Sequence, residues 1–121
     1  MKKIVYIITH DPRERCELVS SAFAQALTAL SFGHECELFV MDGAVRLLQP
    51  DYIAGLKAET FEPLAGLIAY YKELGGKIYG CNPAMASRQV TAENCMKGID
   101  GYVNASKLIE SSVEASAVFS Y

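Results

Sequence analysis

The segment 3–9 constrains the fold more strongly than any other part of the sequence. Apolar β-branched and aromatic residues follow one another from Ile4 to Ile8, without the alternation expected of a strand that has one solvated face. Such a run is typical of a strand that is covered on both faces. It therefore predicts a parallel sheet enclosed between layers of helices.

Strand-like and helix-like segments alternate along the rest of the chain. Further strands are predicted at 35–41, 77–80, 100–103 and 117–121. Helices are predicted at 12–31, 62–74, 84–89 and 105–115, with helical turns at 44–48 and 92–97 and an irregular stretch at 49–60. This order predicts one α/β domain spanning residues 1–121, a three-layer α/β/α sandwich around a mainly parallel five-stranded sheet.

Capping signals fix two of the expected helix ends. Asp11, Pro12 and Glu14 have the spacing of a capping box with proline at the first helical position, so the first long helix is expected to begin at Pro12. Gly75 and Gly76 follow the helix at 62–74 and supply its C-terminal cap.

Composition argues against several classes of partner. The net charge is −3 and the lysines and arginines are scattered, so nucleic acid is a poor partner. Lys2 and Lys3 precede an apolar run that is too short for a signal peptide, and no apolar stretch reaches the ~20 residues needed to span a bilayer. We therefore expect a cytoplasmic protein with no membrane span.

Four cysteines, Cys16, Cys36, Cys81 and Cys95, occur without CxxC spacing and are expected to be free thiols. Cys16 and Cys36 fall on the apolar sides of a helix and a strand, which favours an interpretation as core residues. No metal site is expected, because only His34 and Cys36 approach ligand spacing. No cofactor is expected, since no GxGxxG, Walker or Ser/Thr-rich phosphate loop is present.

Cys81 differs from the other cysteines because it stands where a strand ends and a helix begins. The unpaired N–H groups of a helix start favour a thiolate over a thiol. Asn82 is expected to cap that helix ahead of Pro83, and Arg88 supplies a cation that could pair with the thiolate or a bound anion. From this local pattern alone, a small residue fitted to a crowded strand end is an equally good interpretation.

Other polar residues are expected at the carboxyl ends of the strands, where ligands gather in parallel sheets. Thr9 and His10 follow the first strand, and His10 could carry a proton for Cys81 if the first and third strands are neighbours; otherwise it is a solvated loop residue. Asp42 and Gly43 follow the second strand and either line the cleft or simply make the turn.

The segment 81–90, Cys-Asn-Pro-Ala-Met-Ala-Ser-Arg-Gln-Val, resembles a segment of the DsrE/DsrF-like family in which a cysteine ends a strand and precedes a short Ala-rich helix, an arginine and a glycine. The resemblance extends to the opening strand, the long first helix, the segment 39–45, the Gly-Gly turn and the closing strand. Gln89 departs from the family by standing where glycine is common. The pair Asn82-Pro83 is also more rigid than usual.

The resemblance implies a sulfur carrier. It places the carrier thiol at Cys81, which would accept a sulfane sulfur as a persulfide and pass it to the thiol of a partner protein. Cys95 could act as a second, resolving thiol, or it is a buried helical cysteine.

The resemblance also implies a homo-oligomer, a trimer or hexamer. Its surfaces are expected to include the stretch 49–60, because the apolar side chains there would be costly to leave together in water: Tyr52, Ile53, Leu56 and Phe61.

Two other functions remain open. The domain could be a binding module that holds a small ligand at the strand ends, with Cys81 only lining the pocket. Alternatively it is a scaffolding or regulatory subunit, whose tyrosines would suit protein interfaces.

Overall fold

The computed structural model describes residues 1–121 and contains a five-stranded sheet in which every strand pair is parallel. The strands are β1 (Lys3–Ile8), β2 (Glu35–Val40), β3 (Lys77–Cys81), β4 (Gly101–Val103) and β5 (Ala117–Ser120). Their order across the sheet is β4-β3-β2-β1-β5, so β5 and β4 are the two edges. The predicted α/β class and parallel five-stranded sheet are confirmed.

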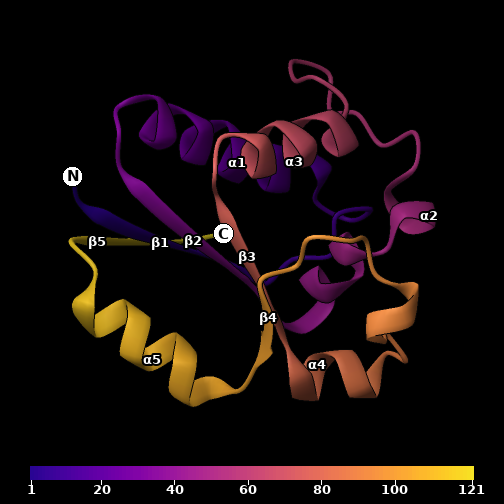
Figure 1. Ribbon diagram of the computed structural model, residues 1–121. Coiled ribbons are helices and arrows are strands. Elements are labelled where there is room, and N and C mark those ends of the chain that lie inside the picture. The colour runs from indigo at the N-terminus through magenta and orange to yellow at the C-terminus, as the bar shows by residue number, and fades with distance from the viewer.

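The helices form a layer on each face of this sheet. The α-helices are α1 (Cys16–Ser31), α2 (Pro50–Ile53), α3 (Leu64–Glu73), α4 (Asn82–Ser87) and α5 (Ala105–Glu114), and the 3-10 helices are η1 (Asp42–Leu48) and η2 (Ala92–Asn94). Helices α1 and α3 lie side by side on one face and α5 lies on the other, while α4 packs beside η1 at the carboxyl end of β3 (Figure 1). No helix is long and apolar enough to cross a membrane.

Side chains alternate between the two faces of the sheet and fill two unequal cores. The larger core lies under α1, α3 and η1 and includes Phe23, Leu38 and Tyr71, all fully buried. The smaller one contains Val5, Phe39 and Tyr79, with Leu108 of α5 packed against it. The uninterrupted apolar run of β1 therefore serves both layers, which is the reason that this strand lacks a polar face.

Tyr71 and Gly76 fix the entry to β3. The Tyr71 hydroxyl donates to the carbonyl oxygen of Lys77 at 2.7 Å and also lies 3.2 Å from that of Cys36, which ties α3 to β2 and β3. A Cβ atom at Gly76 would overlap the Tyr71 ring, and Gly75 holds a left-handed φ of +94°. The Gly-Gly turn is thus required both for backbone geometry and for close packing.

The first long helix begins four residues later than the capping signals predict. α1 starts at Cys16 with no side-chain cap, because the Asp11 carboxylate accepts hydrogen bonds from the Arg13 N–H at 2.8 Å and from the Tyr52 hydroxyl at 2.6 Å. The backbone carbonyl of Asp11 closes a turn with Glu14 and Arg15 instead. The carboxylate serves this turn and a distant tyrosine, and the capping box does not form.

The stretch 49–60 is less irregular than expected, since it contains α2. Ile53 is buried, and the half-buried side chains of Tyr52, Leu56 and Phe61 pack against the larger core. The expectation that these side chains need a neighbouring subunit to remove them from water is therefore wrong. These apolar groups leave water by packing on their own domain.

Candidate functional site

Cys81 is the last residue of β3 and the residue from which α4 begins. Its backbone is extended, with φ −90° and ψ 117°, and its free thiol belongs to a partly exposed side chain. α4 has only six residues and Pro83 in its first turn. The predicted strand-to-helix junction at Cys81 is confirmed, although so short a helix supplies only a small part of a full helix dipole.

Gly80, the residue before Cys81, lets side chains from three other elements pack directly against the end of β3. A Cβ atom at Gly80 would lie 2.9 Å from Sδ of Met85, 3.0 Å from Cδ1 of Leu48 and 3.3 Å from Cδ1 of Tyr102. Side chains from η1, α4 and β4 therefore close directly onto this strand. Glycine is needed for that approach.

Asn82 does not cap α4, contrary to the sequence prediction. Its side-chain amide donates to the Tyr102 carbonyl oxygen at 3.2 Å and to Oδ1 of Asn104 at 3.1 Å. The side chain thus ties the residue after Cys81 to the end of β4, and the first N–H groups of α4 receive no side-chain acceptor from it.

Arg88 folds back over the end of α4. Its Nη1 atom donates to the Ala84 carbonyl oxygen at 3.3 Å and to the Ser87 hydroxyl at 3.0 Å. These bonds hold the guanidinium on its own helix. A pairing of Arg88 with the Cys81 thiolate stays a prediction.

The remaining predicted site residues are spread along the carboxyl edge of the sheet. Asp42 and Gly43 follow β2, next to β3, and Asp42 holds a left-handed φ of 48°. His10 is exposed and follows β1. Proton transfer between His10 and Cys81 was expected only if the first and third strands are neighbours. Because β2 lies between β1 and β3, this condition is not met.

Thr9 faces the opposite edge of the sheet from Cys81. Its backbone N–H and its hydroxyl both donate to the Tyr121 carbonyl oxygen, at 2.9 and 3.1 Å. With neighbouring strands about 4.8 Å apart, β1 lies roughly 10 Å from β3. Thr9 therefore holds the end of β5 in place and lies well away from the thiol.

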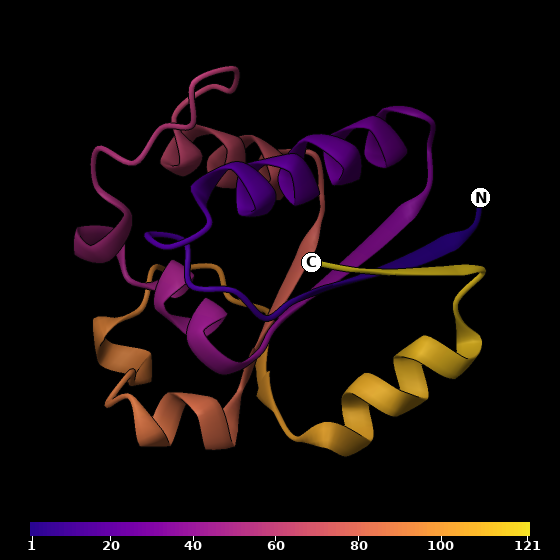
Figure 2. The ribbon, with the colours of Figure 1, turned by 180° about the vertical axis from the view of Figure 1, so that it is seen from behind.

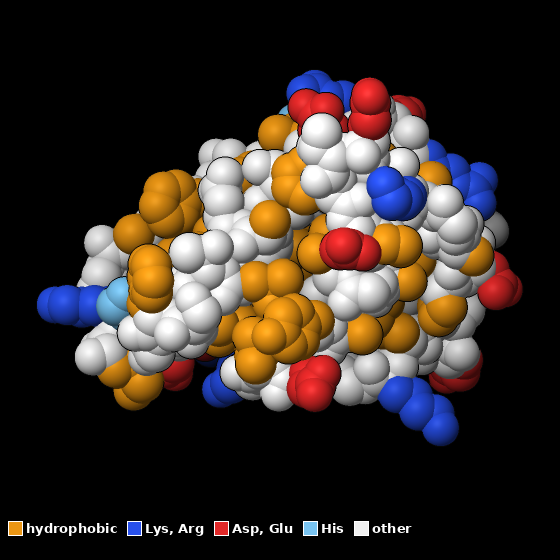
Figure 3. Space-filling model, turned by 90° about the horizontal axis from the view of Figure 1, so that it is seen from above, with side chains coloured by type: hydrophobic (Ala, Val, Ile, Leu, Met, Phe, Trp, Pro, Cys, Tyr) orange, Lys and Arg blue, Asp and Glu red, His pale blue; other side chains and the backbone are white.

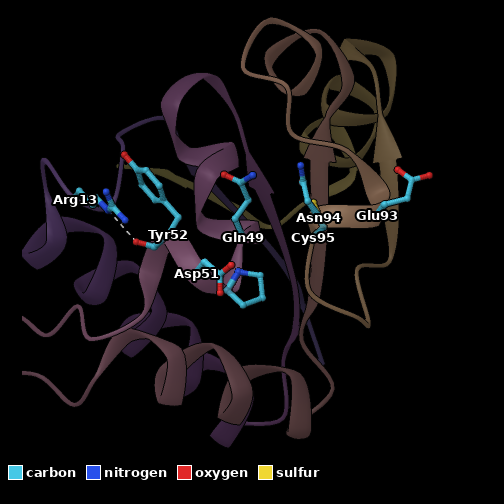
Figure 4. Close-up of a pocket in the computed structure, with 8 residues that line it drawn as sticks. Arg13, Gln49, Asp51, Tyr52, Glu93, Asn94 and Cys95 are labelled. Atoms are coloured by element: carbon cyan, nitrogen blue, oxygen red, sulfur yellow. Dashed lines mark hydrogen bonds between the residues drawn. The ribbon is translucent and has the colours of Figure 1, made fainter.

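A pocket of about 500 Å³ that the sequence did not predict lies at this end of the molecule, between α2 and η2 (Figure 4). It is lined by Arg13, Gln49, Pro50, Asp51, Tyr52, Glu93, Asn94 and Cys95. The Arg13 guanidinium stacks on the Tyr52 ring, 3.9 Å from its centroid, and its Nε donates to the Tyr52 carbonyl oxygen at 2.9 Å. These two residues are 39 positions apart, so no local pattern could have revealed the pair.

Cys95, and not Cys81, lines this pocket. The interpretation of Cys95 as a buried helical residue is wrong, because it follows η2 and is partly exposed. Burial raises the pKa of its thiol, and a hydrogen bond with Tyr102 acts in the opposite direction. At neutral pH, Cys95 is therefore held mainly as the thiol.

The other two thiols differ from each other. Cys36 is buried, as predicted, and burial raises its pKa to about 11. Cys16 is partly exposed in the first turn of α1, with Sγ 3.9 Å from the Ser20 hydroxyl, so its interpretation as a core residue is wrong. No three side chains among histidine, cysteine, aspartate and glutamate gather as a metal site would require.

Together these features define a parallel α/β sandwich that carries a partly exposed thiol at the carboxyl edge of its sheet. The sequence matches the DsrE/DsrF-like family over residues 2–120. The chain belongs to the DsrE/DsrF-like family, as the segment around Cys81 predicted.

Solved structures with the same fold cover the whole chain. The ychN protein from E. coli superimposes with a TM-score of 0.81 at 16% identity, over 100% of both chains. MTH1491 from Methanobacterium thermoautotrophicum, a protein of unknown function, gives a TM-score of 0.74 at 15% identity, over 98% of this chain and 99% of its own. No curated protein sequence matches the chain.

Proposed function

We propose that this protein is a sulfur carrier, in which Cys81 accepts a sulfane sulfur as a persulfide and passes it to the thiol of a partner protein. The observation that carries the proposal is the placement of a partly exposed free thiol at the carboxyl end of β3 in a DsrE/DsrF-like domain. Ligands of parallel α/β sheets gather at this edge.

The proposed transfer needs no cofactor and no external oxidant. The Cys81 thiolate attacks the outer sulfur of a donor persulfide, so that a new S–S bond forms at Cys81 and the donor leaves as a thiolate. The thiolate of the acceptor protein then attacks the same outer sulfur and releases Cys81 as a thiolate. The sulfane sulfur changes carriers twice, and no net oxidation occurs.

The other predicted site residues are proposed to contact the partner protein. Asp42 and Gly43 lie one strand from Cys81, and Thr9 and His10 lie two strands away. The two-strand separation of Thr9 and His10, roughly 10 Å, is too large for contact with the sulfur but fits a protein surface docked along the edge. Asn82 supports the thiol by fixing the backbone next to it.

Intact mass spectrometry of protein isolated without reductant tests this proposal. After incubation with a small-molecule persulfide, the wild type should gain the mass of one sulfur atom, and Cys81→Ser should gain none. Cys16→Ser and Cys95→Ser are matched controls that should keep the gain, because these thiols are also partly exposed. Sulfur that remains on Cys81→Ser and disappears from Cys95→Ser would overturn the assignment.

The remaining features of the proposal rest on family resemblance. The carrier is proposed to work in the cytoplasm with a donor and an acceptor protein, as a homo-oligomer of three or six subunits.

A small-ligand-binding function is the second candidate, and the pocket beside Cys95 favours it. The pocket combines an arginine stacked on a tyrosine with carboxylate and amide groups, and Cys81 is absent from its lining. Native mass spectrometry separates the two functions. A binding module retains a dissociable molecule that denaturation releases, whereas a carrier shows covalent mass on a thiol.

A further inference from the structure

The edge strand β5 lacks the features that usually prevent edges from pairing. Its four residues, Ala117–Ser120, carry no charge, no proline and no bulge. The opposite edge, β4, is only three residues long. β5 runs along the near side of the molecule in Figure 2, with α1 above it and α5 below it, and no element passes in front of it.

The hydrogen bonds of Tyr121 show which backbone groups of β5 are free. Tyr121 donates to the Ile7 carbonyl oxygen at 2.8 Å and accepts from the Thr9 N–H at 2.9 Å, so its polar groups face β1. Bonding directions alternate along a strand, and the continuous register of β5 with β1 makes Phe119 face β1 as well. Val118 and Ser120 therefore direct their N–H and C=O groups outward.

Apolar side chains surround these free groups. On the α1 face, Phe119 stacks on Tyr6 and helps to line an apolar groove of about 390 Å³ that also includes Phe32. Three large apolar side chains on this edge and its groove are exposed in part: Phe32 by 74%, Val118 by 44% and Phe119 by 47%. Hydrophobic groups are also visible on the outer α1–α3 surface in Figure 3.

The exposed area fits an interface between two copies. With about 200 Å² for a whole aromatic side chain and somewhat less for valine, the three side chains expose roughly 300 Å². Interfaces are about 60% apolar, so this corresponds to about 500 Å² per partner, or roughly 1,000 Å² in total, which is the smallest area expected of a specific interface.

We propose that β5 pairs antiparallel with β5 of a second copy of this chain, around a two-fold axis that passes beside Phe119. Val118 of each copy would exchange both backbone hydrogen bonds with Ser120 of the other, which gives four new bonds. Phe119 then faces its own counterpart in a non-hydrogen-bonded pair, with Cα atoms about 4.5 Å apart. The two copies share one continuous sheet, and the proposal is independent of the chemistry of Cys81.

This register predicts a selective disulfide. In Phe119→Cys the two introduced thiols face each other at a distance that a disulfide can span, so mild oxidation should link the dimer. In the matched control Ser120→Cys, the introduced cysteine lies opposite Val118 and too far from its own counterpart, so little linkage should form. Equal linkage of both variants, or of neither, would overturn the proposed register.

Sedimentation at micromolar concentration tests the interface without new thiols. Ser120→Pro removes an outward N–H that β1 does not use, so the domain should keep its melting temperature while the mass of the assembly is halved. A two-fold contact allows a dimer or joins two trimers into a hexamer, but it cannot occur in an isolated trimer. The proposal is refuted if the wild type is monomeric or trimeric, or if Ser120→Pro has an unchanged mass. The β5 edge would then be available to pair with a strand of another protein.

Discussion

Gln89 holds a left-handed backbone conformation, with φ 57°, immediately after the end of α4. The Val90 N–H donates to the Met85 carbonyl oxygen at 2.9 Å and the Gln89 N–H to the Ala86 carbonyl oxygen at 3.3 Å, which are the two bonds of a Schellman motif. Met85 and Val90 are both buried and supply its usual apolar pair. Glycine is the residue that best suits Gln89's place in this motif, so we predict that Gln89→Gly stabilises the protein.

The size of the effect follows from two opposing terms. The left-handed conformation costs a residue with a Cβ atom about 1–2 kcal/mol. Glycine avoids this cost but loses more conformational entropy on folding, about 0.5–1 kcal/mol. The exposed Gln89 side chain makes no hydrogen bond, and its carbonyl oxygen keeps its bond from the Asn94 amide. The net gain is therefore about 0.5–1 kcal/mol.

Thermal unfolding followed by circular dichroism measures this gain. For 121 residues, an unfolding entropy of about 2.1 cal/mol/K per residue converts the gain to a rise of about 2–4 °C in melting temperature. Gln89→Ala is the matched control, because it removes the same side chain and keeps the left-handed strain, so its melting temperature should not rise. If both variants melt at the same temperature, or glycine lowers it, the strain argument fails.

Three further predictions concern the thiols and the turn before β3. Cys81 should be alkylated fastest in the native protein and Cys36 slowest, as measured by peptide mapping, and faster labelling of Cys95 would contradict the site. Cys81→Ser should change the unfolding free energy by less than about 0.5 kcal/mol. Cys36 has a pKa raised from 9.0 to about 11, so its stabilising contribution is complete below pH 9 and is lost as the pH rises to 11. Urea titrations should therefore find that wild type loses about 2–3 kcal/mol more than Cys36→Ala over this interval, and parallel curves would refute the shift. Gly76→Ala should cost about 1–3 kcal/mol through overlap with the Tyr71 ring, and an unchanged urea midpoint would show that the ring can move freely.

Local patterns in the sequence determined every strand and every helix except α2. Runs of apolar, β-branched and aromatic residues identified all five strands, and the run in β1 is uninterrupted because both faces of the sheet are covered there. The Gly75-Gly76 turn and the junction at Cys81 were also predictable, since proline and glycine act on their own backbone. The position of the candidate thiol thus followed from residues close to it in the chain.

The tertiary structure alone decided which side chains meet. Strand order placed β2 between β1 and β3 and separated His10 from Cys81, and hydrophobic periodicity carries no information about that order. Asp11 bonds Tyr52, 41 positions away, and Asn82 bonds Asn104, 22 positions away, although local rules favour each as a helix cap. A polar side chain takes the best hydrogen-bond partner in the folded chain, and such a partner is set by packing rather than by neighbouring sequence.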